Sequence, residues 1–279
     1  MISIRKALEQ ASQQLDALDT DTRLEAELLL GHLLNKNRAY LYAHAEEAIN
    51  AEQSEAFKQL IAQRASGIPI AYLTGYRDFW SLTLKVNSHT LIPRHDTERL
   101  VELTLELLGD QPNISVLDMG TGSGAIALAL AKERPDWEIS ACDASEEALK
   151  VAMENAADLG LGTIHFYHSD WFSALPEKKY HAIISNPPYI NEQDPHLNQG
   201  DVRFEPRSAL VSSQEGLADL QYIIQHGYDH LLPNGLLLLE HGYDQKTDIE
   251  TILNKSGYKN VQCWQDIQGH DRVSGGWHP

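Results

Sequence analysis

The sequence predicts an α/β protein with a mostly parallel, Rossmann-like sheet, preceded by a small helical domain and a linking β-hairpin. From about residue 96 onward, short apolar runs alternate with helix-length stretches, which is typical of a parallel sheet covered by helices on both faces. A glycine-rich turn at residues 120–124 directly follows one of the apolar runs. Residues 1–74 show only helical periodicity.

The first 74 residues predict a compact set of helices. Apolar residues recur at helical spacing in RKALEQASQQLDAL, in RLEAELLLGHLL after Asp21-Thr22, and in AEQSEAFKQLIAQRASG. Gly67 is a predicted helix end. Residues 75–95 then alternate in the pattern of a β-hairpin, with Asn87-Ser88 as a turn. The predicted domains are therefore 1–74, 75–95 and 96–279.

The remaining residues predict strands and helices in regular alternation. The strands are ISVLDMG, WEISACD, IHFYHSDW, HAIISNPPY, GLLLLEHG, VQCWQDI and RVSGGWHP, and the helices are AIALALAKERP, SEEALKVAMENAADLG, LADLQYIIQHGYDHLL and DIETILNKSG. Ser145 is the predicted N-cap of the second helix. No stretch is long enough to span a bilayer, and no secretory leader is expected from MISIRKALEQ.

Charge and cysteine content narrow the function classes. The formal net charge is -18, and residues 86–279 carry 13 Lys and Arg against 29 Asp and Glu. Such acidity disfavours a broad nucleic-acid footprint and suits a basic protein partner, although plain solubility explains it equally well. Two cysteines without metal-ligand spacing indicate a reducing, cytoplasmic compartment. The histidines show no ligand spacing, so we expect no metal.

The glycine-rich turn predicts a ligand site at the end of a strand. In DMGTGSG, Asp118 ends the strand and Gly120, Gly122 and Gly124 follow at every second position, with Thr121 and Ser123 between them. A dinucleotide fingerprint has the spacing G-x-G-x-x-G, which this loop lacks. Asp118 would repel a diphosphate and would suit a ligand with a sulfonium or ammonium charge, or it could simply hold the loop.

Polar side chains at successive strand ends predict one shared crevice. Asp143 ends the second strand, where an acidic residue binds ribose hydroxyls in nucleoside-binding folds. Asp170-Trp171 end the third strand and could contact a base, although a turn residue and a core aromatic are the simpler alternatives. Asn186 ends the fourth strand and opens Asn-Pro-Pro-Tyr, whose prolines cannot extend a ladder. Taken alone, that turn could serve only to stop the strand.

These residues together resemble a known family. The order DMGTGSG, Asp143, SDW and NPPY is similar to class I S-adenosylmethionine-dependent methyltransferases that act on amino groups. The stretches IPRHDTE, SDWFSAL, SNPPYINEQDPHL and DVRFEP, together with the helical first domain, resemble the HemK/PrmC family. His95 stands where that family's pattern has proline. The resemblance implies S-adenosylmethionine as cofactor and methylation of the glutamine in the Gly-Gly-Gln motif of peptide chain release factors.

The resemblance also implies a role for each site residue. The cofactor loop falls on residues 118–124, the ribose-binding acid on Asp143, and the adenine side on Asp170 and Trp171, with Asn186 adjoining the cofactor. Asn186, Pro187, Pro188 and Tyr189 would form the target-amide site. As a hypothesis, the Asn186 side-chain oxygen and the Pro187 carbonyl accept hydrogen bonds from the target amide and align its nitrogen with the methyl group. Tyr189 would pack on the amide plane.

Two competing functions stay open at this point, and a third is excluded. A nucleic-acid amino methyltransferase shares the NPPY-type loop and flips a base into it, but the acidic composition and the lack of a basic segment argue against it. A non-catalytic binding module would not need the glycine loop, Asp143 and NPPY together. A dinucleotide oxidoreductase fails on glycine spacing. We expect no membrane association and a monomeric enzyme. Arg94, Asp96 and Glu98 could line the substrate entry, although a cluster at the start of a helix is the simpler interpretation, and Glu205 could order the loop after Asn-Pro-Pro-Tyr.

Overall fold

The computed structural model describes residues 2–18 and 20–279, and this part of the chain divides into two compact units. The first unit contains residues 1–76 and 198–204, and the second contains 77–197 and 205–279. Segment 198–204 follows the predicted crevice in sequence yet packs with the helical unit, which no local sequence pattern indicates. The predicted domain limits stay a prediction.

The helical unit is held together by one apolar core. Its elements are β1 (Ile2–Ser3), α1 (Ile4–Leu15), α2 (Thr22–Leu34), α3 (Arg38–Ala43), β2 (Ala48–Ile49), α4 (Ala51–Ala65) and α5 (Ile70–Thr74). The predicted helices correspond to α1, α2 and α4, and α4 ends two residues before Gly67. The structure adds the two short helices and a two-residue strand pair. The buried Arg64 pairs with Glu25 and with Asp201, which anchors segment 198–204 to this unit.

The predicted hairpin is present as two short strands, β3 (Tyr76–Phe79) and β4 (Leu82–Lys85). The predicted turn at Asn87-Ser88 closes with the Thr90 N–H donating to the Asn87 carbonyl at 3.0 Å. The 3-10 turn η1 (His95–Thr97) then leads directly into α6 (Glu98–Leu108). His95 therefore fits this turn without the proline of the family pattern.

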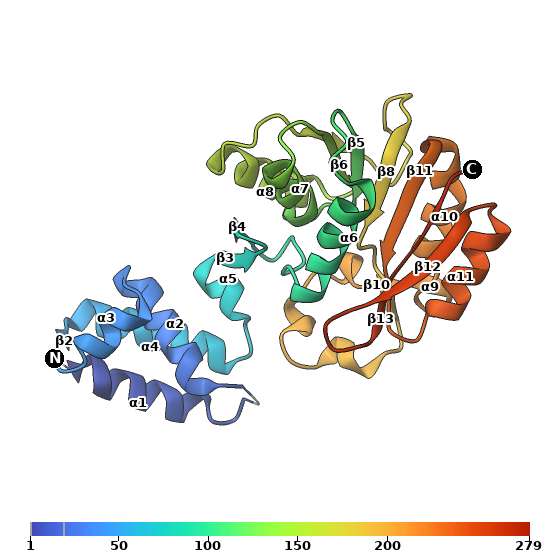
Figure 1. Cartoon of the computed structure of the whole chain (residues 1–279). Helices are drawn as coiled ribbons and strands as arrows, with labels where there is room; N and C mark the ends of the chain where they lie inside the picture. Colours follow the sequence, from blue (N-terminus) through green and yellow to red (C-terminus); the bar gives the residue numbers. More distant parts are fainter. Residues whose placement is uncertain (1, 19) are drawn as a thin grey trace. The chain divides into compact units, whose positions relative to one another are not determined.

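The second unit is built on one seven-stranded sheet (Figure 1). After α6, its elements are β5 (Ser115–Met119), α7 (Ala125–Glu133), β6 (Glu138–Asp143), α8 (Glu146–Asp158), β7 (His165–His168), β8 (Tyr180–Ser185), β9 (Ile190–Asn191), η2 (Pro195–Asn198), η4 (Arg207–Ala209), β10 (Val211–Ser212), α9 (Ser213–Gly216), α10 (Ala218–His230), β11 (Leu231–Glu240), α11 (Lys246–Lys255), β12 (Lys259–Gln265) and β13 (Asp271–Trp277). The 3-10 turn η3 (Val202–Phe204) lies in segment 198–204 of the first unit.

The strand order is β12-β13-β11-β8-β5-β6-β7. Strands β11, β8, β5, β6 and β7 run parallel, whereas β13 pairs antiparallel with β11 and β12. The chain moves outward from β5 through β6 to β7 and then returns to β8 on the other side. This reversal creates a topological switch point between β5 and β8, where open α/β sheets bind ligands.

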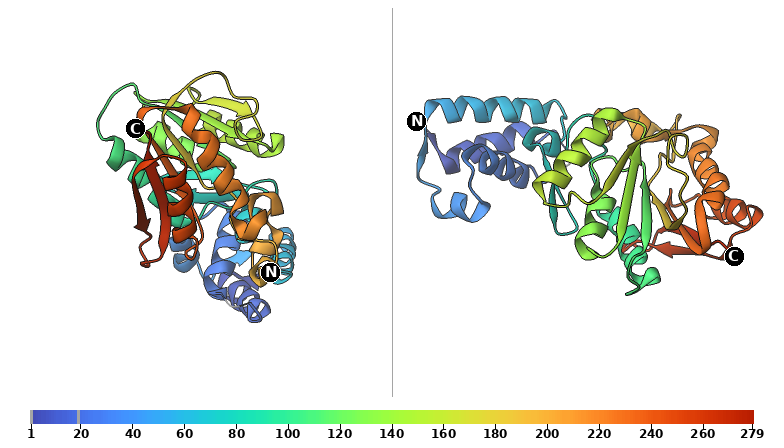
Figure 2. Two further views of the ribbon diagram at one scale, coloured as in Figure 1. Left: turned by 90° about the vertical axis from the view of Figure 1, so that its right-hand side faces the viewer. Right: turned by 90° about the horizontal axis from the view of Figure 1, so that it is seen from above.

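Alternating strand residues divide the core between the two faces of the sheet. On β8, Ala182 and Ile184 pack in a cluster with α6 and α7, while Ile183 packs in a second cluster with α10 and α11. Figure 1 shows α6 and α7 on one side of β8 and β11 and α10 and α11 on the other, and Figure 2 gives two further views of the ribbon. The expected α/β class with helices on both faces is confirmed. Because helices cover both faces of the sheet, the strand ends are the place where a ligand can bind.

Candidate active site

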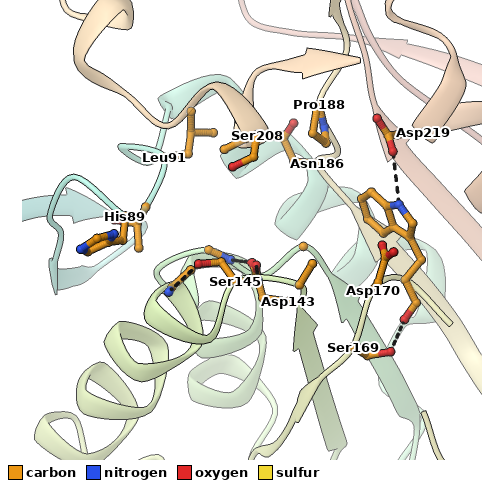
Figure 3. Close-up of a pocket in the computed structure, with 17 residues that line it drawn as sticks. His89, Leu91, Asp143, Ser145, Ser169, Asp170, Asn186, Pro188, Ser208 and Asp219 are labelled. Carbon is orange, nitrogen blue, oxygen red and sulfur yellow. Dashed lines mark hydrogen bonds between the residues drawn. The ribbon is translucent and has the colours of Figure 1, made fainter. Parts of the chain in front are cut away.

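The carboxyl ends of β5, β6, β7 and β8 surround a cavity of about 340 Å³ (Figure 3). This volume lies within the range of small-molecule sites. The residues that line it are His89, Thr90, Leu91, Gly120, Gly122, Asp143, Ala144, Ser145, Ala148, Ser169, Asp170, Trp171, Asn186, Pro188, Ser208, Ala209 and Asp219. The expected crevice therefore joins all four strand ends.

The glycine loop has positive φ angles, which residues with a Cβ adopt only with strain. Gly120, Gly122 and Gly124 have φ values of 70°, 57° and 87°. Gly120 and Gly122 line the cavity, and a Cβ on Gly122 would meet no atom within 4 Å. A Cβ on Gly124 would lie 2.9 Å from the Leu128 side chain and 3.2 Å from Ala152. Two glycines thus give a ligand access to the main chain, while the third lets α7 and α8 pack closely.

Asp118 lies beneath this loop and does not line the cavity. Its side chain is fully buried, and Oδ2 accepts from the Thr121 hydroxyl at 2.6 Å and from the Ala127 N–H at 3.2 Å. Burial raises the pKa of this carboxyl to about 7. Thr121 and Ser123 are also buried outside the cavity lining. These contacts favour the simpler role of Asp118, which is to hold the shape of the loop.

Asp143 is fixed by two backbone groups at the end of β6. Its Oδ2 accepts from the Gly122 N–H at 2.8 Å, and its Oδ1 accepts from the Ser145 N–H at 2.8 Å (Figure 3). Burial raises the pKa of Asp143, and these two hydrogen bonds oppose that rise. The predicted cap is confirmed, because the Ser145 hydroxyl accepts from the Ala148 N–H. The carboxylate is thus held rigidly at the cavity with lone pairs left for ligand hydroxyls.

The indole of Trp171 lines another side of the cavity. Trp171 has a positive φ of 47°, and its Nε1–H donates to Asp219 at 3.2 Å (Figure 3). The Ser169 hydroxyl donates to the Trp171 carbonyl at 2.7 Å. A Cβ on Gly120 would lie only 3.6 Å from the indole ring. Asp170, in contrast, is exposed at the rim, so its carboxylate remains available to a polar group.

The Asn-Pro-Pro-Tyr turn is anchored to the sheet at both ends. Before it, the Ser185 hydroxyl donates to the Met119 carbonyl at 2.7 Å and thereby ties β8 to β5. After it, the Gln245 side chain donates to the Tyr189 carbonyl at 3.0 Å. A Cβ on Gly216 would lie 2.1 Å from that same carbonyl, so the turn is tightly enclosed. Rigid anchoring is what a group that aligns a substrate needs.

The side chain of Asn186 has a defined orientation at the cavity. Its Nδ2 donates to the Thr97 hydroxyl at 3.0 Å. The oxygen of the same amide is left as the acceptor for a ligand. Pro188 lines the cavity beside Asn186, whereas Pro187 is buried and outside the lining. An acceptor in this position suits a ligand that carries an N–H group.

The hydroxyl of Tyr189 points away from the cavity lining into the protein. It donates to the carboxyl of Glu240 at 3.1 Å. Burial and the neighbouring Glu240 raise the pKa of this phenol well above its usual value. The residue as a whole is half-buried, and it is not among the cavity-lining residues. The predicted contact between Tyr189 and the target amide stays a prediction.

Glu205 orders the loops around the turn. Its fully buried carboxylate accepts from the Ile92 N–H at 3.0 Å and from the Arg94 guanidinium. Glu98 accepts from the Trp80 N–H at 2.8 Å at the start of α6. Arg94, Asp96 and Glu98 are not among the cavity-lining residues, which favours their simpler interpretation as a helix-start cluster.

Several site residues were not predicted from the sequence. The loops at His89–Leu91 and Ser208–Ala209 line the cavity, and Asp219 orients the indole of Trp171. Thr97 accepts a hydrogen bond from the Asn186 side chain, and Glu240 accepts one from the Tyr189 hydroxyl. One signal was available, since Glu240 is a charged residue that ends the apolar run GLLLLE at the same edge as Asp143 and Asn186.

Nowhere in 2–18 and 20–279 do three or more His, Cys, Asp or Glu side chains gather in a way that could hold a metal ion. None of the helices in this part of the chain combines the length and the apolar character that crossing a bilayer requires.

The chain matches two protein families along most of its length. Residues 6–75 match the family described as the PrmC N-terminal domain, and residues 97–204 match the methyltransferase small domain. The chain is 49% identical to a release factor glutamine methyltransferase from Shewanella oneidensis, over 98% of this chain and 95% of that protein. It is 47% identical to the release factor glutamine methyltransferase of Escherichia coli, over 96% of each.

Solved structures support the fold alone. A methyltransferase from Pyrococcus furiosus superposes with a TM-score of 0.54 at 16% identity, covering 79% of this chain and 97% of that one. A 16S rRNA N2 methyltransferase from T. thermophilus, solved with AdoMet and guanosine, superposes with a TM-score of 0.52 at 18% identity. The superposition covers 73% of this chain and 50% of that one. Both likenesses agree with the α/β fold described above.

Proposed function

This chain belongs to the family of release factor glutamine methyltransferases, and we propose that it transfers the methyl group of S-adenosylmethionine to the side-chain amide nitrogen of a release factor glutamine. The glutamine is that of the Gly-Gly-Gln motif. The observation that supports this most is Asn186, an amide at the cavity whose nitrogen is engaged and whose oxygen can accept from a second amide. Methylation at this position would support translation termination.

The residues present at the cavity fit S-adenosylmethionine. Asp143 has a carboxylate suited to two ribose hydroxyls, and Trp171 has a flat face suited to adenine. Gly120 and Gly122 leave main chain open to the ligand, and Asp170 lies at the rim. When bound, the cofactor supplies an electrophilic methyl group on a sulfonium. The acidic strand ends suit that positive charge.

The chain's own contribution is to present the amide nitrogen correctly. A glutamine nitrogen is a poor nucleophile, because its lone pair is delocalised into the carbonyl. The Asn186 oxygen and the Pro187 carbonyl accept from its two N–H groups and hold the nitrogen toward the methyl group. In-line positioning of this kind is worth several kcal/mol of the barrier, at about 1.4 kcal/mol for each tenfold in rate. Both acceptors also stabilise positive charge that develops on the nitrogen.

Proton release requires no strong base at the site. The methylated nitrogen carries a very acidic proton, which passes to solvent or to a carbonyl oxygen. Tyr189 is unsuited to act as a base, because its hydroxyl donates to Glu240 and its pKa is raised. Its ring would pack on the amide plane and exclude water. Asn186, Pro187 and Tyr189 thus form the catalytic set of this proposal, and Pro188 completes the substrate site.

The helical unit would bind the release factor protein. We propose that the enzyme acts as a monomer in the cytoplasm, on protein and not on nucleic acid. The acidic second unit, with a net charge of -16 over residues 86–279, suits a basic partner surface and disfavours a phosphate backbone.

The test offers labelled S-adenosylmethionine with four acceptors in parallel. They are a release factor, the same factor with its motif glutamine changed to alanine, ribosomal RNA and duplex DNA. We expect label on the intact factor alone, recovered as methylglutamine after hydrolysis. Label on nucleic acid, or equal label on the altered factor, would leave the methyltransferase fold standing and overturn the substrate.

A further inference from the structure

A buried carboxylate lies behind the Asn-Pro-Pro-Tyr turn. Glu240 ends β11 and its side chain is 1% exposed. Oε1 accepts from the Tyr189 hydroxyl at 3.1 Å. Oε2 is buried and has no hydrogen-bond partner among the described residues. A carboxyl group in this environment is costly to keep, so its presence calls for a reason beyond packing.

A second contact joins the same carboxyl to Asn186. Thr97 lies in η1, and its hydroxyl accepts from Asn186 Nδ2 at 3.0 Å. The Thr97 side chain also interacts with the Glu240 carboxyl and lowers the pKa of that carboxyl. Glu240 therefore contacts Tyr189 directly and reaches Asn186 through Thr97. Tyr189 lies 51 residues before Glu240 in the sequence, and Asn186 lies further away still.

We infer that Glu240 is a positioning residue of the amide-binding turn, whose ionised carboxylate orients Asn186 through Thr97 and fixes Tyr189 directly. The inference rests on the proposed function, because it assigns a purpose to the orientation of Asn186. Glu240 does not line the cavity and so acts only through these neighbours.

The direction of the hydrogen bonds explains why the ionised form is the competent one. An ionised carboxylate only accepts, so it draws the hydroxyl protons of Thr97 and Tyr189 toward itself. The oxygen of Thr97 then faces Asn186 Nδ2 as an acceptor, and the Asn186 amide cannot flip. Its oxygen stays directed to the substrate. Protonated Glu240 carries one O–H donor and keeps only part of its acceptor capacity, so it no longer draws both hydroxyl protons toward itself.

The charge adds a second effect. A chain of hydrogen bonds that ends on an anion polarises each member. The Asn186 oxygen becomes a stronger acceptor as positive charge develops on the substrate nitrogen. The effect is greatest where water is excluded, as it is around Glu240.

The surroundings place the ionisation of Glu240 in the working range of pH. Burial is the largest cause that raises the pKa of Glu240 and Asp96 adds to it, while Thr97, Arg272 and Tyr189 lower it, and together these effects raise the pKa to about 7. The charged or titratable groups facing it are thus Asp96 from η1, Tyr189 from the turn and Arg272 from β13. The residue that follows β11 is His241, whose pKa is lowered by burial. Activity should therefore rise as pH increases through about 7.

The first test is Glu240→Gln, which keeps the shape and an acceptor oxygen but cannot ionise. We expect kcat for methyl transfer to the release factor to fall about tenfold, as when supporting partners of a functional ligand are removed. The KM for the factor and the affinity for S-adenosylmethionine should change little. The rise of kcat through pH 7 should disappear. Wild-type kcat with the same pH profile would overturn the proposal.

Thr97→Val is the second test and leaves the carboxyl in place. Because the Thr97 hydroxyl lowers the pKa of Glu240, its loss should move the midpoint of the kcat profile to higher pH. Tyr189→Phe should move it the same way. The matched control is Tyr180→Phe, which removes a buried hydroxyl from the far end of β8. An unmoved midpoint in Thr97→Val, or an equal shift in Tyr180→Phe, would contradict the inference.

A readout without substrate separates this inference from the proposed function. Infrared difference spectra between pH 5 and 9 report a protonated carboxyl band, which Glu240→Gln should remove. The band should titrate at higher pH in Thr97→Val. If wild-type protein shows this behaviour but leaves the release factor unmethylated, the proposed substrate fails and the network stands. If the band is absent while methylation is normal, the network fails and the function stands.

Discussion

The two loops that form the site are each supported by a buried carboxylate, and the two carboxylates do different things. Asp118 lies under the glycine loop and Glu240 lies behind the Asn-Pro-Pro-Tyr turn. Each is buried, each has a pKa raised to about 7, and each has one oxygen without a partner in the described chain. Asp118, however, reaches a backbone N–H and a loop hydroxyl, whereas Glu240 reaches side chains of the turn.

This difference assigns cofactor binding to the glycine loop and alignment of the reacting amide to the Asn-Pro-Pro-Tyr turn. A loop that cradles a cofactor must have a fixed backbone, and glycine conformation together with Asp118 provides it. A turn that aligns an amide must have a fixed side-chain direction, which prolines alone cannot provide. Changes in the first loop should therefore appear in stability and cofactor affinity. Changes in the second should appear in kcat.

The largest expected effect is that of Asn186→Ala. Loss of the acceptor that aligns the amide nitrogen should lower kcat by about 100-fold or more, comparable to removing one preorganised donor from an oxyanion site. The measurement is methyl transfer to the release factor at saturating cofactor. Undiminished transfer would remove Asn186 from the mechanism and with it the division between the two loops.

Gly124→Ala should be the most damaging change in the glycine loop. Its φ of 87° and the 2.9 Å contact with Leu128 combine strain with overlap. We expect a loss of about 2–3 kcal/mol in the free energy of unfolding, measured by denaturant titration. Gly122→Ala is the matched control, since its Cβ meets open space, and it should lose only about 1–2 kcal/mol. Equal losses would show that packing is irrelevant here.

Asp143→Asn should weaken cofactor binding with little effect on stability. Asparagine cannot accept from both the Gly122 and Ser145 N–H groups, and it gives weaker bonds to ribose hydroxyls. The Kd for S-adenosylmethionine should rise about 10-fold to 100-fold, as expected for 1.5–3 kcal/mol. Calorimetric titration measures it. An unchanged Kd would count against the ribose assignment.

The last effect is on the pH dependence of stability, which is spread over several pH units. The pKa of Asp118 rises from 3.8 in the unfolded chain to about 7 in the folded protein. Between these values the folded state binds more protons, so its stability falls as pH rises, by at most about 1.4 kcal/mol per pH unit. Asp118→Asn should flatten this fall between pH 4 and 7. Glu240→Gln should do the same, since its pKa is raised too. A slope unchanged in both variants would show that neither carboxyl titrates in this window.

The comparison also shows what the sequence could predict. Gly120, Asp143 and Asn186 were found because each follows an apolar run directly, and parallel strands bring their carboxyl ends to one edge. That reasoning needs only local pattern and sheet geometry. The sheet class, the main helices and the Ser145 cap follow from the same kind of signal.

The supporting contacts could not be predicted in this way. Thr97 meets Asn186 across 89 residues, and Glu240 meets Tyr189 across 51. No periodicity specifies which hydroxyl meets which amide, because that depends on how η1 and β11 approach the turn. The role of the SGGW stretch also could not be predicted from the sequence. In the structure, a Cβ on Gly275 would lie 2.3 Å from the Leu237 carbonyl, so pairing of β13 with β11 requires glycine at this position.

The most direct test of the division between the two loops is calorimetric titration of S-adenosylmethionine into Asn186→Ala, with Asp143→Asn measured alongside. Asn186 and Asp143 line the same cavity, but only Asp143 is assigned to the cofactor's ribose. We predict that Asn186→Ala binds the cofactor with a Kd within about tenfold of wild type while its methyl transfer is lost. A loss of affinity in Asn186→Ala as large as that in Asp143→Asn would contradict the account.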